Sequence, residues 1–237
     1  MKSLSYFLNV AFLSTYPPRE CGIATFTQDL VRELKKKKFL RTGVVAVSDR
    51  PYRYGDEVWH EVAQPERSSY LDAAEWINRS DIQVLMVEHE YGIYGGVAGS
   101  YLLDLLDRVC KPVVATLHTV RPAPDDRQRE ILKALCQKSA KIVTMASNSR
   151  RILQEQYGAA PEKIVVIPHG VPRYDLPSRE ELKEQMGLQG RAVVSTFGLI
   201  GPGKGLEYGV EAIAKVAKTH PDVLYLILGQ THPVILR

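Results

Sequence analysis

The chain has 237 residues, of which 45% are hydrophobic and 24% charged, with 31 Lys and Arg against 27 Asp and Glu. This composition is typical of a globular protein and excludes a disordered tail. The formal net charge of +4 suits anionic ligands but lacks the basic density of a nucleic-acid binder, so we expect no nucleic acid among the partners.

The first part of the chain alternates short β-branched runs with amphipathic segments. Strands are predicted at residues 4–13, 43–47, 82–87, 112–117, 141–145 and 163–167. The first helix is predicted to begin at a capping box from Thr25 to Gln28, and further helices at 97–106, 127–135 and 150–157. This alternation predicts an α/β fold with a Rossmann-like, doubly wound parallel sheet.

A proline-rich segment at 168–172 breaks the pattern, and we place a hinge there. It separates a first domain, 1–172, from a second part, 173–237. In the second part we predict a helix at 178–186, a strand at 192–197, a helix at 206–218 and a strand at 223–228. Two strands cannot cover both faces of a parallel sheet, so we expect an incomplete second βαβ domain.

The cysteines and the lysines bear on location. Cys21, Cys110 and Cys136 are an odd, widely spaced set, which favours a reducing compartment, and we therefore expect a cytoplasmic protein. Lys35 to Lys38 close the first predicted helix. One interpretation is a solvated helix end that complements the helix dipole, and the other is peripheral attraction to an anionic membrane surface.

Two glycine-containing loops precede predicted helices. Gly22, with Ile23 next to it, opens the first helix, where free N–H groups can bind an anion; the alternative is a tight turn that needs one glycine. The segment 198–205 comes within one residue of a P-loop, with Gly205 where Ser or Thr is required. We expect Lys204 to contact a diphosphate there; the alternative is a glycine-rich turn with a solvated lysine.

Polar residues follow two neighbouring predicted strands. Glu88, His89, Tyr91 and Gly92 lie at the end of one strand, and His118 follows the next. In open α/β sheets ligands bind at the carboxyl ends of strands, so these residues are candidates for a ligand cleft. His118 is either a ligand contact or a satisfied structural histidine. Adjacent acidic and histidine residues cannot converge on zinc, and we predict no metal site.

Taken in chain order, the motifs resemble those of the retaining glycosyltransferases of family four, which have a GT-B fold. The motifs are YPPRECGIA (16–24), EHEYG (88–92), LHT (117–119), IPHGV (167–171) and FGLIGPGKG (197–205). The resemblance implies transfer of a sugar, with mannose as the first guess, from a nucleotide-sugar donor to a sugar or sugar-lipid acceptor, with retention of configuration. It implies no metal and no cofactor besides the donor substrate.

The resemblance also implies roles for individual residues. His118 matches the family's catalytic histidine beside the transferred sugar. The donor diphosphate is expected to lie between Gly22 and Ile23 on one side and Lys204 and Gly205 on the other. The acceptor or sugar side is expected to include Arg19 together with the residues of the EHEYG motif: Glu88, His89, Tyr91 and Gly92.

The sequence departs from the family pattern in two places. Leu199 stands where an arginine is usual, and the family's later glutamate pair lies beyond Arg237. We therefore expect the present chain to be inactive alone and to self-associate through uncovered apolar faces. The alternative to an enzyme is a non-catalytic module, derived from a truncated transferase, that binds a ligand or partner.

Overall fold

A computed structural model describes residues 7–171 and 174–231. The start of the first predicted strand, residues 4–6, and Pro172 in the predicted hinge lie outside these residues. The chain forms two compact units, Met1–Gly170 and Val171–Arg237, and their border falls close to the predicted hinge. Each unit is described by itself.

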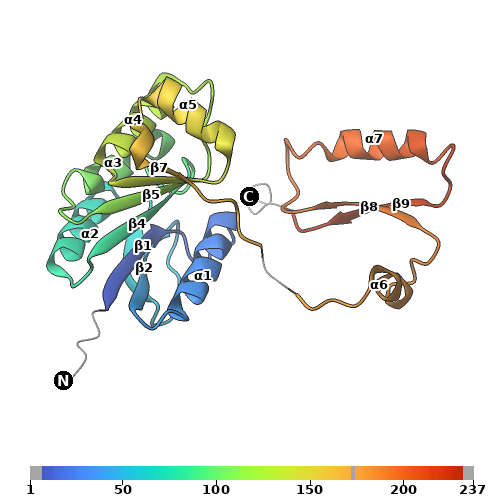
Figure 1. Ribbon diagram of the computed structural model, residues 1–237, viewed down its shortest axis with the longest axis horizontal. Helices are drawn as coiled ribbons and strands as arrows, with labels where there is room; N and C mark the ends of the chain where they lie inside the picture. Colours follow the sequence, from blue (N-terminus) through green and yellow to red (C-terminus); the bar gives the residue numbers. More distant parts are fainter. Residues whose placement is uncertain (1–6, 172–173, 232–237) are drawn as a thin grey trace. The chain divides into compact units, whose positions relative to one another are not determined.

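The first unit is built on a seven-stranded sheet in the order β3-β2-β1-β4-β5-β6-β7 (Figure 1). Every pair of neighbouring strands is parallel. The strands are β1 (Leu8–Ser14), β2 (Leu40–Ser48), β3 (Val58–Ala63), β4 (Val84–His89), β5 (Val113–Leu117), β6 (Lys141–Thr144) and β7 (Ile164–Val166). The order reverses beside β1, which is the feature that defines a doubly wound sheet, and the predicted fold class is confirmed.

Helices cover both faces of this sheet. They are α1 (Gly22–Lys35), α2 (Arg67–Arg79), α3 (Tyr101–Leu106), α4 (Asp126–Lys138) and α5 (Ser147–Tyr157), with short 3₁₀ turns at Val97–Gly99 and Pro161–Lys163. In Figure 1, α1 lies on one side of the sheet and the other helices lie on the opposite side. Successive residues of a strand point to opposite faces, so β1 contributes to the packing on both sides.

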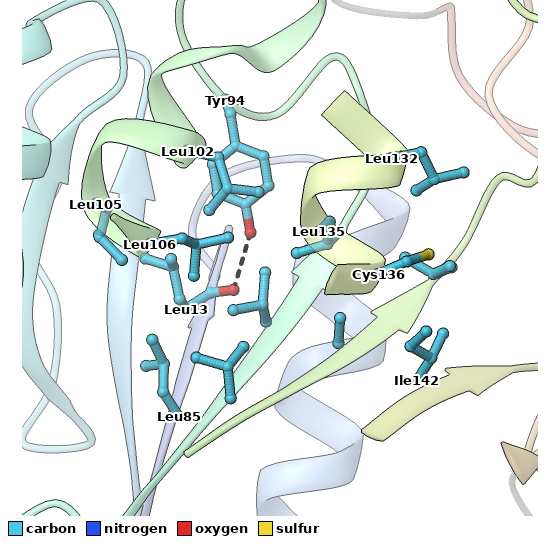
Figure 2. Close-up of a cluster of buried hydrophobic side chains, with 14 of the residues drawn as sticks. Leu13, Leu85, Tyr94, Leu102, Leu105, Leu106, Leu132, Leu135, Cys136 and Ile142 are labelled. Carbon is cyan, nitrogen blue, oxygen red and sulfur yellow. Dashed lines mark hydrogen bonds between the residues drawn. The ribbon is translucent and has the colours of Figure 1, made fainter. Parts of the chain in front are cut away.

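The core therefore consists of two clusters of buried apolar side chains. The smaller cluster joins Val31 of α1 to Val10 and Phe12 of β1. The larger cluster contains the alternate β1 residues Ala11 and Leu13 and the apolar faces of α2 to α5. Figure 2 shows leucines of α3 and α4 packed over the strands, and the Tyr94 hydroxyl donating a hydrogen bond to the Leu13 carbonyl oxygen at 3.1 Å. The larger cluster anchors the carboxyl ends of β1, β4 and β5.

Two elements of the first unit were not predicted. β3 is an edge strand with His60 and Glu61 at its centre, so it lacks a continuous apolar run. α2 begins without a side-chain cap and has a mostly polar composition, although Tyr70, Ala73 and Ile77 follow helical spacing and are buried. The predicted helix at 97–106 is interrupted at its start, and α3 begins at Tyr101.

The predicted capping box at Thr25 is wrong. α1 begins three residues earlier in the chain, at Gly22, and Cys21 precedes it without a side-chain hydrogen bond to the helix. Thr25 lies within the first turn of the helix, and its hydroxyl instead donates to the Cys21 carbonyl at 3.5 Å. A true capping box, between Asp125 and Gln128, begins α4.

The second unit contains α6 (Arg179–Gln185), β8 (Ala192–Phe197), α7 (Leu206–Val216) and β9 (Val223–Leu228). β8 and β9 pair in parallel, and α7 connects them, so this part is a βαβ unit as predicted. None of the described residues of this unit is buried. Within the part of the chain that the structure describes, no helix is both long and apolar enough to cross a bilayer.

Candidate functional site

The candidate site of the first unit lies at the carboxyl edge of the sheet. Parallel strands end at the same edge, so the segments after β1, β4, β5 and β7 are brought together there. Hydrogen bonds continue the sheet past the end of β5, because the N–H of His118 donates to the carbonyl of His89 at 3.0 Å. This bond fixes the chain at the point where His118 leaves the strand.

The N-terminus of α1 is open at this edge. No side chain caps the helix, and within the described residues no hydrogen bond reaches the N–H groups of Gly22 and Ile23. A Cβ placed on Gly22 would meet no described atom within 4 Å, and its backbone is not left-handed. The fold therefore does not require glycine at this position, and the alternative of a turn that needs glycine loses its support. The free N–H groups and the helix dipole suit an anion.

His118 is held by a buried carboxylate. Its Nε2 lies 2.9 Å from Oε2 of Glu88, and the two side chains are 8% and 0% exposed. The sheet register creates this contact, because Glu88 pairs with Thr116 across β4 and β5 and His118 lies two residues beyond. Glu88 was expected on the acceptor side; in the described residues its carboxylate is enclosed and contacts His118, and the acceptor role stays a prediction.

Two residues that sequence reasoning missed join His118 to other elements. Phe26 of α1 packs edge-on against the His118 ring, with centroids 4.8 Å apart, and it also contacts His169 at 5.2 Å. Phe26 lies four residues after Gly22, so helical spacing places both on one face of α1. That spacing, together with the IPHGV motif that contains His169, was the signal available in the sequence.

Glu90 is a third residue that was missed. The hydroxyl of Thr119 donates to Oε2 of Glu90, and the N–H of Tyr91 donates to its Oε1 at 2.9 Å. Glu88 and Glu90, two residues apart, therefore hold the consecutive residues His118 and Thr119. The segment after β4 fixes the segment after β5 at two points.

The other residues expected on the acceptor side occupy different surroundings. Arg19 donates to the carbonyl of Val47 at 3.1 Å and is 12% exposed, so it is engaged with the end of β2. His89 is buried, and within the described residues neither ring nitrogen has a hydrogen-bond partner. Tyr91 is 8% exposed, and burial raises the pKa of its hydroxyl. His89 and Tyr91 are thus buried in the described structure, whereas Gly92 is exposed, and the acceptor contacts expected of these residues stay predictions.

The burial of His89 sets its charge. Burial, and to a lesser degree the neighbouring His118, lowers the pKa of His89 to about 3. The ring is therefore neutral at physiological pH. Its edge-on contact with Tyr91, with centroids 4.9 Å apart, is a packing contact between uncharged rings.

The glycine-rich loop of the second unit requires glycine for its backbone conformation, whereas the Gly22 position does not. Gly203 and Gly205 have φ of 82° and 66°, in the left-handed region that favours glycine. Gly205 is also the residue immediately before α7. Lys204, between them, is exposed, and none of the described side chains forms a hydrogen bond or ion pair with its amine. Backbone shape accounts for these glycines, and Lys204 is left free for a ligand.

Among residues 7–171 and 174–231, no three His, Cys, Asp or Glu side chains are grouped as a metal site requires.

Curated relatives match part of the chain. A D-inositol 3-phosphate glycosyltransferase of Geodermatophilus obscurus is 29% identical over 154 residues, which are 56% of this chain and 34% of the relative. A 2-deoxystreptamine glucosyltransferase of Streptomyces kanamyceticus is 30% identical over 102 residues, which are 39% of this chain and 25% of the relative. The matched region thus spans about a third or less of the length of these relatives.

Solved structures share the fold. A glycosyltransferase from Rickettsia africae superposes with a TM-score of 0.64 at 17% identity, covering 94% of this chain and 61% of that one. The HepE protein of Anabaena, in complex with UDP and glucose, superposes with a TM-score of 0.63 at 15% identity, covering 95% and 62%. Likeness at this identity shows the fold, which is that of the Rossmann-like units of GT-B proteins.

The sequence model described as Glycosyltransferase Family 4 matches residues 21–173. The match begins at the residue before α1 and includes the segments that carry Glu88, His118 and His169. Because it covers more than half of the chain, the chain belongs to Glycosyltransferase Family 4.

Proposed function

We propose that the protein is a glycosyltransferase that moves a sugar from a nucleotide-sugar donor to an acceptor with retention of configuration. The observation that carries the proposal is the open N-terminus of α1 beside the His118 ring, joined to it through Phe26, in a chain of Family 4. In this proposal residues 1–172 serve the acceptor side and residues 173–237 begin the donor side.

The proposed donor contacts are backbone N–H groups and the Lys204 amine, which form no hydrogen bond or ion pair within the described residues. In the first unit the proposed diphosphate contacts are the N–H groups of Gly22 and Ile23; in the second unit they are Lys204 and the N–H of Gly205. Charge that develops on the leaving diphosphate is stabilised by a helix end and an ammonium group, and therefore without a metal ion. His118 contacts the transferred sugar, and Gly92 allows an acceptor to approach closely because a Cβ there would meet no described atom within 4 Å.

For the donor we propose a class of sugar nucleotide and not one compound. The HepE structure contains UDP and glucose, and a Staphylococcus aureus MnaA structure contains UDP, so a uridine diphosphate sugar is one candidate. Mannose remains the first guess from the overall sequence likeness. We propose a hexose donor and a sugar or sugar-lipid acceptor.

A donor panel tests this function. UDP-glucose, UDP-N-acetylglucosamine and GDP-mannose are offered to the protein in the presence of EDTA, and binding and sugar release are measured. Lys204→Ala should weaken binding of the accepted donor, or lower kcat/KM, by about tenfold to a hundredfold, because a charge-assisted contact contributes roughly 1.5–3 kcal/mol. Lys215→Ala, at the other end of α7, is the matched control. No binding of any donor, or equal effects of the two variants, contradicts the proposal.

Retention is tested on the product. The anomeric configuration of the new glycosidic bond, read by NMR, should equal that of the donor. An inverted product contradicts the retaining assignment while leaving sugar transfer intact.

A non-catalytic binding module is the second candidate. Leu199 favours it, because the resemblance places an arginine there that would share the diphosphate charge with Lys204. Because the present chain is expected to be inactive alone, this test needs the whole protein: donor binding without any transfer or hydrolysis, restored to turnover by Leu199→Arg, supports the module. Turnover by the natural sequence contradicts it.

We also propose a cytoplasmic protein that contacts anionic membranes peripherally. Lys35, the last residue of α1, and Lys36 to Lys38 after it are all exposed, and the Phe39 side chain next to them is 59% exposed. Near-surface lysines contribute about 1 kcal/mol each to binding an anionic leaflet. We expect co-sedimentation with vesicles that contain phosphatidylglycerol, and loss of binding in high salt or in the variant Lys37→Glu/Lys38→Glu. Equal binding to neutral phosphatidylcholine vesicles, or none to either, overturns this proposal.

A further inference from the structure

The contact between Glu88 and His118 at the carboxyl edge of the sheet fixes one ring nitrogen of His118 against a buried carboxyl group. We propose that Glu88 is a positioning residue that holds His118 in the tautomer with hydrogen on Nε2, so that Nδ1 is the ring atom presented to the ligand. This inference rests on the proposed function only for the identity of the ligand, which is a hydroxyl of the donor sugar.

The argument begins with the hydrogen-bond needs of Glu88. Its side chain is fully buried, and Oε2 lies 2.9 Å from Nε2 of His118. Within the described residues Oε1 has no hydrogen-bond partner, so the His118 ring is the single side-chain group that compensates this carboxylate for loss of water. An ionised carboxylate accepts hydrogen bonds and donates none. In the proposed arrangement Glu88 is the acceptor of this contact, and the hydrogen belongs to Nε2.

The other ring nitrogen is free. Nδ1 of His118 forms no hydrogen bond within residues 7–171 and 174–231, and it is not among the buried polar atoms that lack a partner. The His118 side chain is 8% exposed, and in the proposal Nδ1 is the ring atom open to a ligand. In the neutral ring Nδ1 carries a lone pair and accepts a hydrogen bond from a hydroxyl, whereas in the doubly protonated ring it donates one.

The orientation of the ring is fixed on two further sides. Phe26 meets it edge-on at an interplanar angle of 87°, and the backbone N–H of His118 is held by the His89 carbonyl. Thr119, the next residue, is tied to Glu90. A half-turn of the ring about the Cβ–Cγ bond would place a ring carbon where Nε2 now faces Glu88. The buried carboxylate would then have no hydrogen-bond donor. In this proposal the arrangement determines which nitrogen faces Glu88 and carries the hydrogen, and which nitrogen is presented to the ligand without one.

Nitrogen NMR of the ¹⁵N-labelled chain tests the tautomer directly and needs no substrate. Long-range proton–nitrogen spectra distinguish a ring nitrogen that carries hydrogen from one that does not, and the variant His118→Gln identifies the His118 signals. We expect hydrogen on Nε2 in the natural protein and a mixed or reversed tautomer in Glu88→Gln. Glu90→Gln is the matched control and should leave the His118 tautomer unchanged. A natural protein with hydrogen on Nδ1, or a Glu88→Gln spectrum like the natural one, overturns the proposal.

A pair of substitutions at His118 separates the two nitrogens even where a Glu88 variant does not fold. The side-chain amide of glutamine lies near the position of Nε2, and that of asparagine near the position of Nδ1. Alanine is less informative, because it leaves Glu88 buried without a partner. We expect His118→Gln to keep natural stability and to bind UDP-glucose about 2- to 10-fold more weakly, the loss of one hydrogen bond. We expect His118→Asn to be the less stable variant.

The two proposals fail in different ways. If UDP-glucose and the other donors do not bind while the tautomer depends on Glu88, the donor assignment is wrong and the positioning role stands. If donors bind and His118→Gln binds them as the natural protein does, Nδ1 is not the ligand contact and the present inference is overturned.

Discussion

His89 shows at the scale of one residue how burial becomes a pH response. Its pKa is lowered from 6.5 to about 3, mainly by burial, so the folded chain keeps the ring neutral where the unfolded chain protonates it. Between these values the unfolded state binds more protons, and the free energy of unfolding therefore falls as pH falls. The contribution is fully present above pH 6.5 and is lost progressively toward the folded value.

Urea unfolding measures this contribution. Between about pH 7.5 and about pH 5.5 the His89 ring should reduce the free energy of unfolding by about 1 to 1.5 kcal/mol. His89→Leu removes the titrating group and leaves no new polar atom unpaired. The free energy of unfolding of this variant should therefore fall less over the same pH range, by about 1 to 1.5 kcal/mol. An equal loss in both proteins would show that His89 does not cause the dependence.

The site residues also show what local sequence could reveal. His118, Gly22 and Lys204 were recognised by their places at strand ends and helix starts, which periodicity and glycine positions indicate. Their ligand roles stay predictions. The surroundings of Arg19, Glu88 and His89 were not predictable, because exposure at a strand end depends on which other segment covers it.

Helix α1 carries the prediction that belongs to the element scale. Gly22 has room for a Cβ, whereas a Cβ on Gly43 of β2 would lie 2.0 Å from the Trp59 ring. Gly22→Ala should therefore leave the free energy of unfolding unchanged or raise it by up to ~1 kcal/mol, through the better helix propensity of alanine. If a diphosphate approaches the first turn, the added methyl group should weaken donor binding by about tenfold or more, since an obstructed contact to an anion costs about 1.5–3 kcal/mol.

Gly43→Ala is the contrasting variant. It should lower the free energy of unfolding by about 1–3 kcal/mol, because it overpacks the sheet, and it should leave the affinity of the folded fraction for the donor unchanged. Thermal melts and donor titrations of both variants give the comparison. A destabilised Gly22→Ala with natural donor affinity would return Gly22 to a structural role.

At this scale the sequence was a good guide to buried strands and a poor one to the elements near the edge of the sheet. β1, β2 and β4 to β7 have apolar runs that parallel burial requires. β3 has one neighbour and partly exposed side chains, so its composition resembles that of a loop. The beginning of α1 was misplaced because Thr25, the expected N-cap, lies inside the first turn, where its hydroxyl donates to the Cys21 carbonyl and caps no helix.

For the whole molecule we predict self-association, because the second unit exposes apolar side chains. None of its described residues is buried, and Phe197, Val194 and Leu228 are 87%, 46% and 44% exposed. Contiguous exposed apolar surface drives association. We expect the mass measured by light scattering to rise above that of a monomer as concentration increases, and Phe197→Ser to reduce the rise. A constant monomer mass in the natural protein contradicts this expectation.

The amino-acid sequence by itself determined the α/β class, the alternation of most strands and helices, and the family, and it indicated the segment where the two compact units divide. These are properties of local periodicity, of glycine and proline positions and of motif order, which do not depend on knowing which strands are neighbours. Only the tertiary structure decided the contacts of the site. Glu88 meets His118 across 30 positions of chain because β4 and β5 pair in a particular register. A shift of one residue would turn each side chain to the opposite face, and no local pattern in the sequence specifies that register.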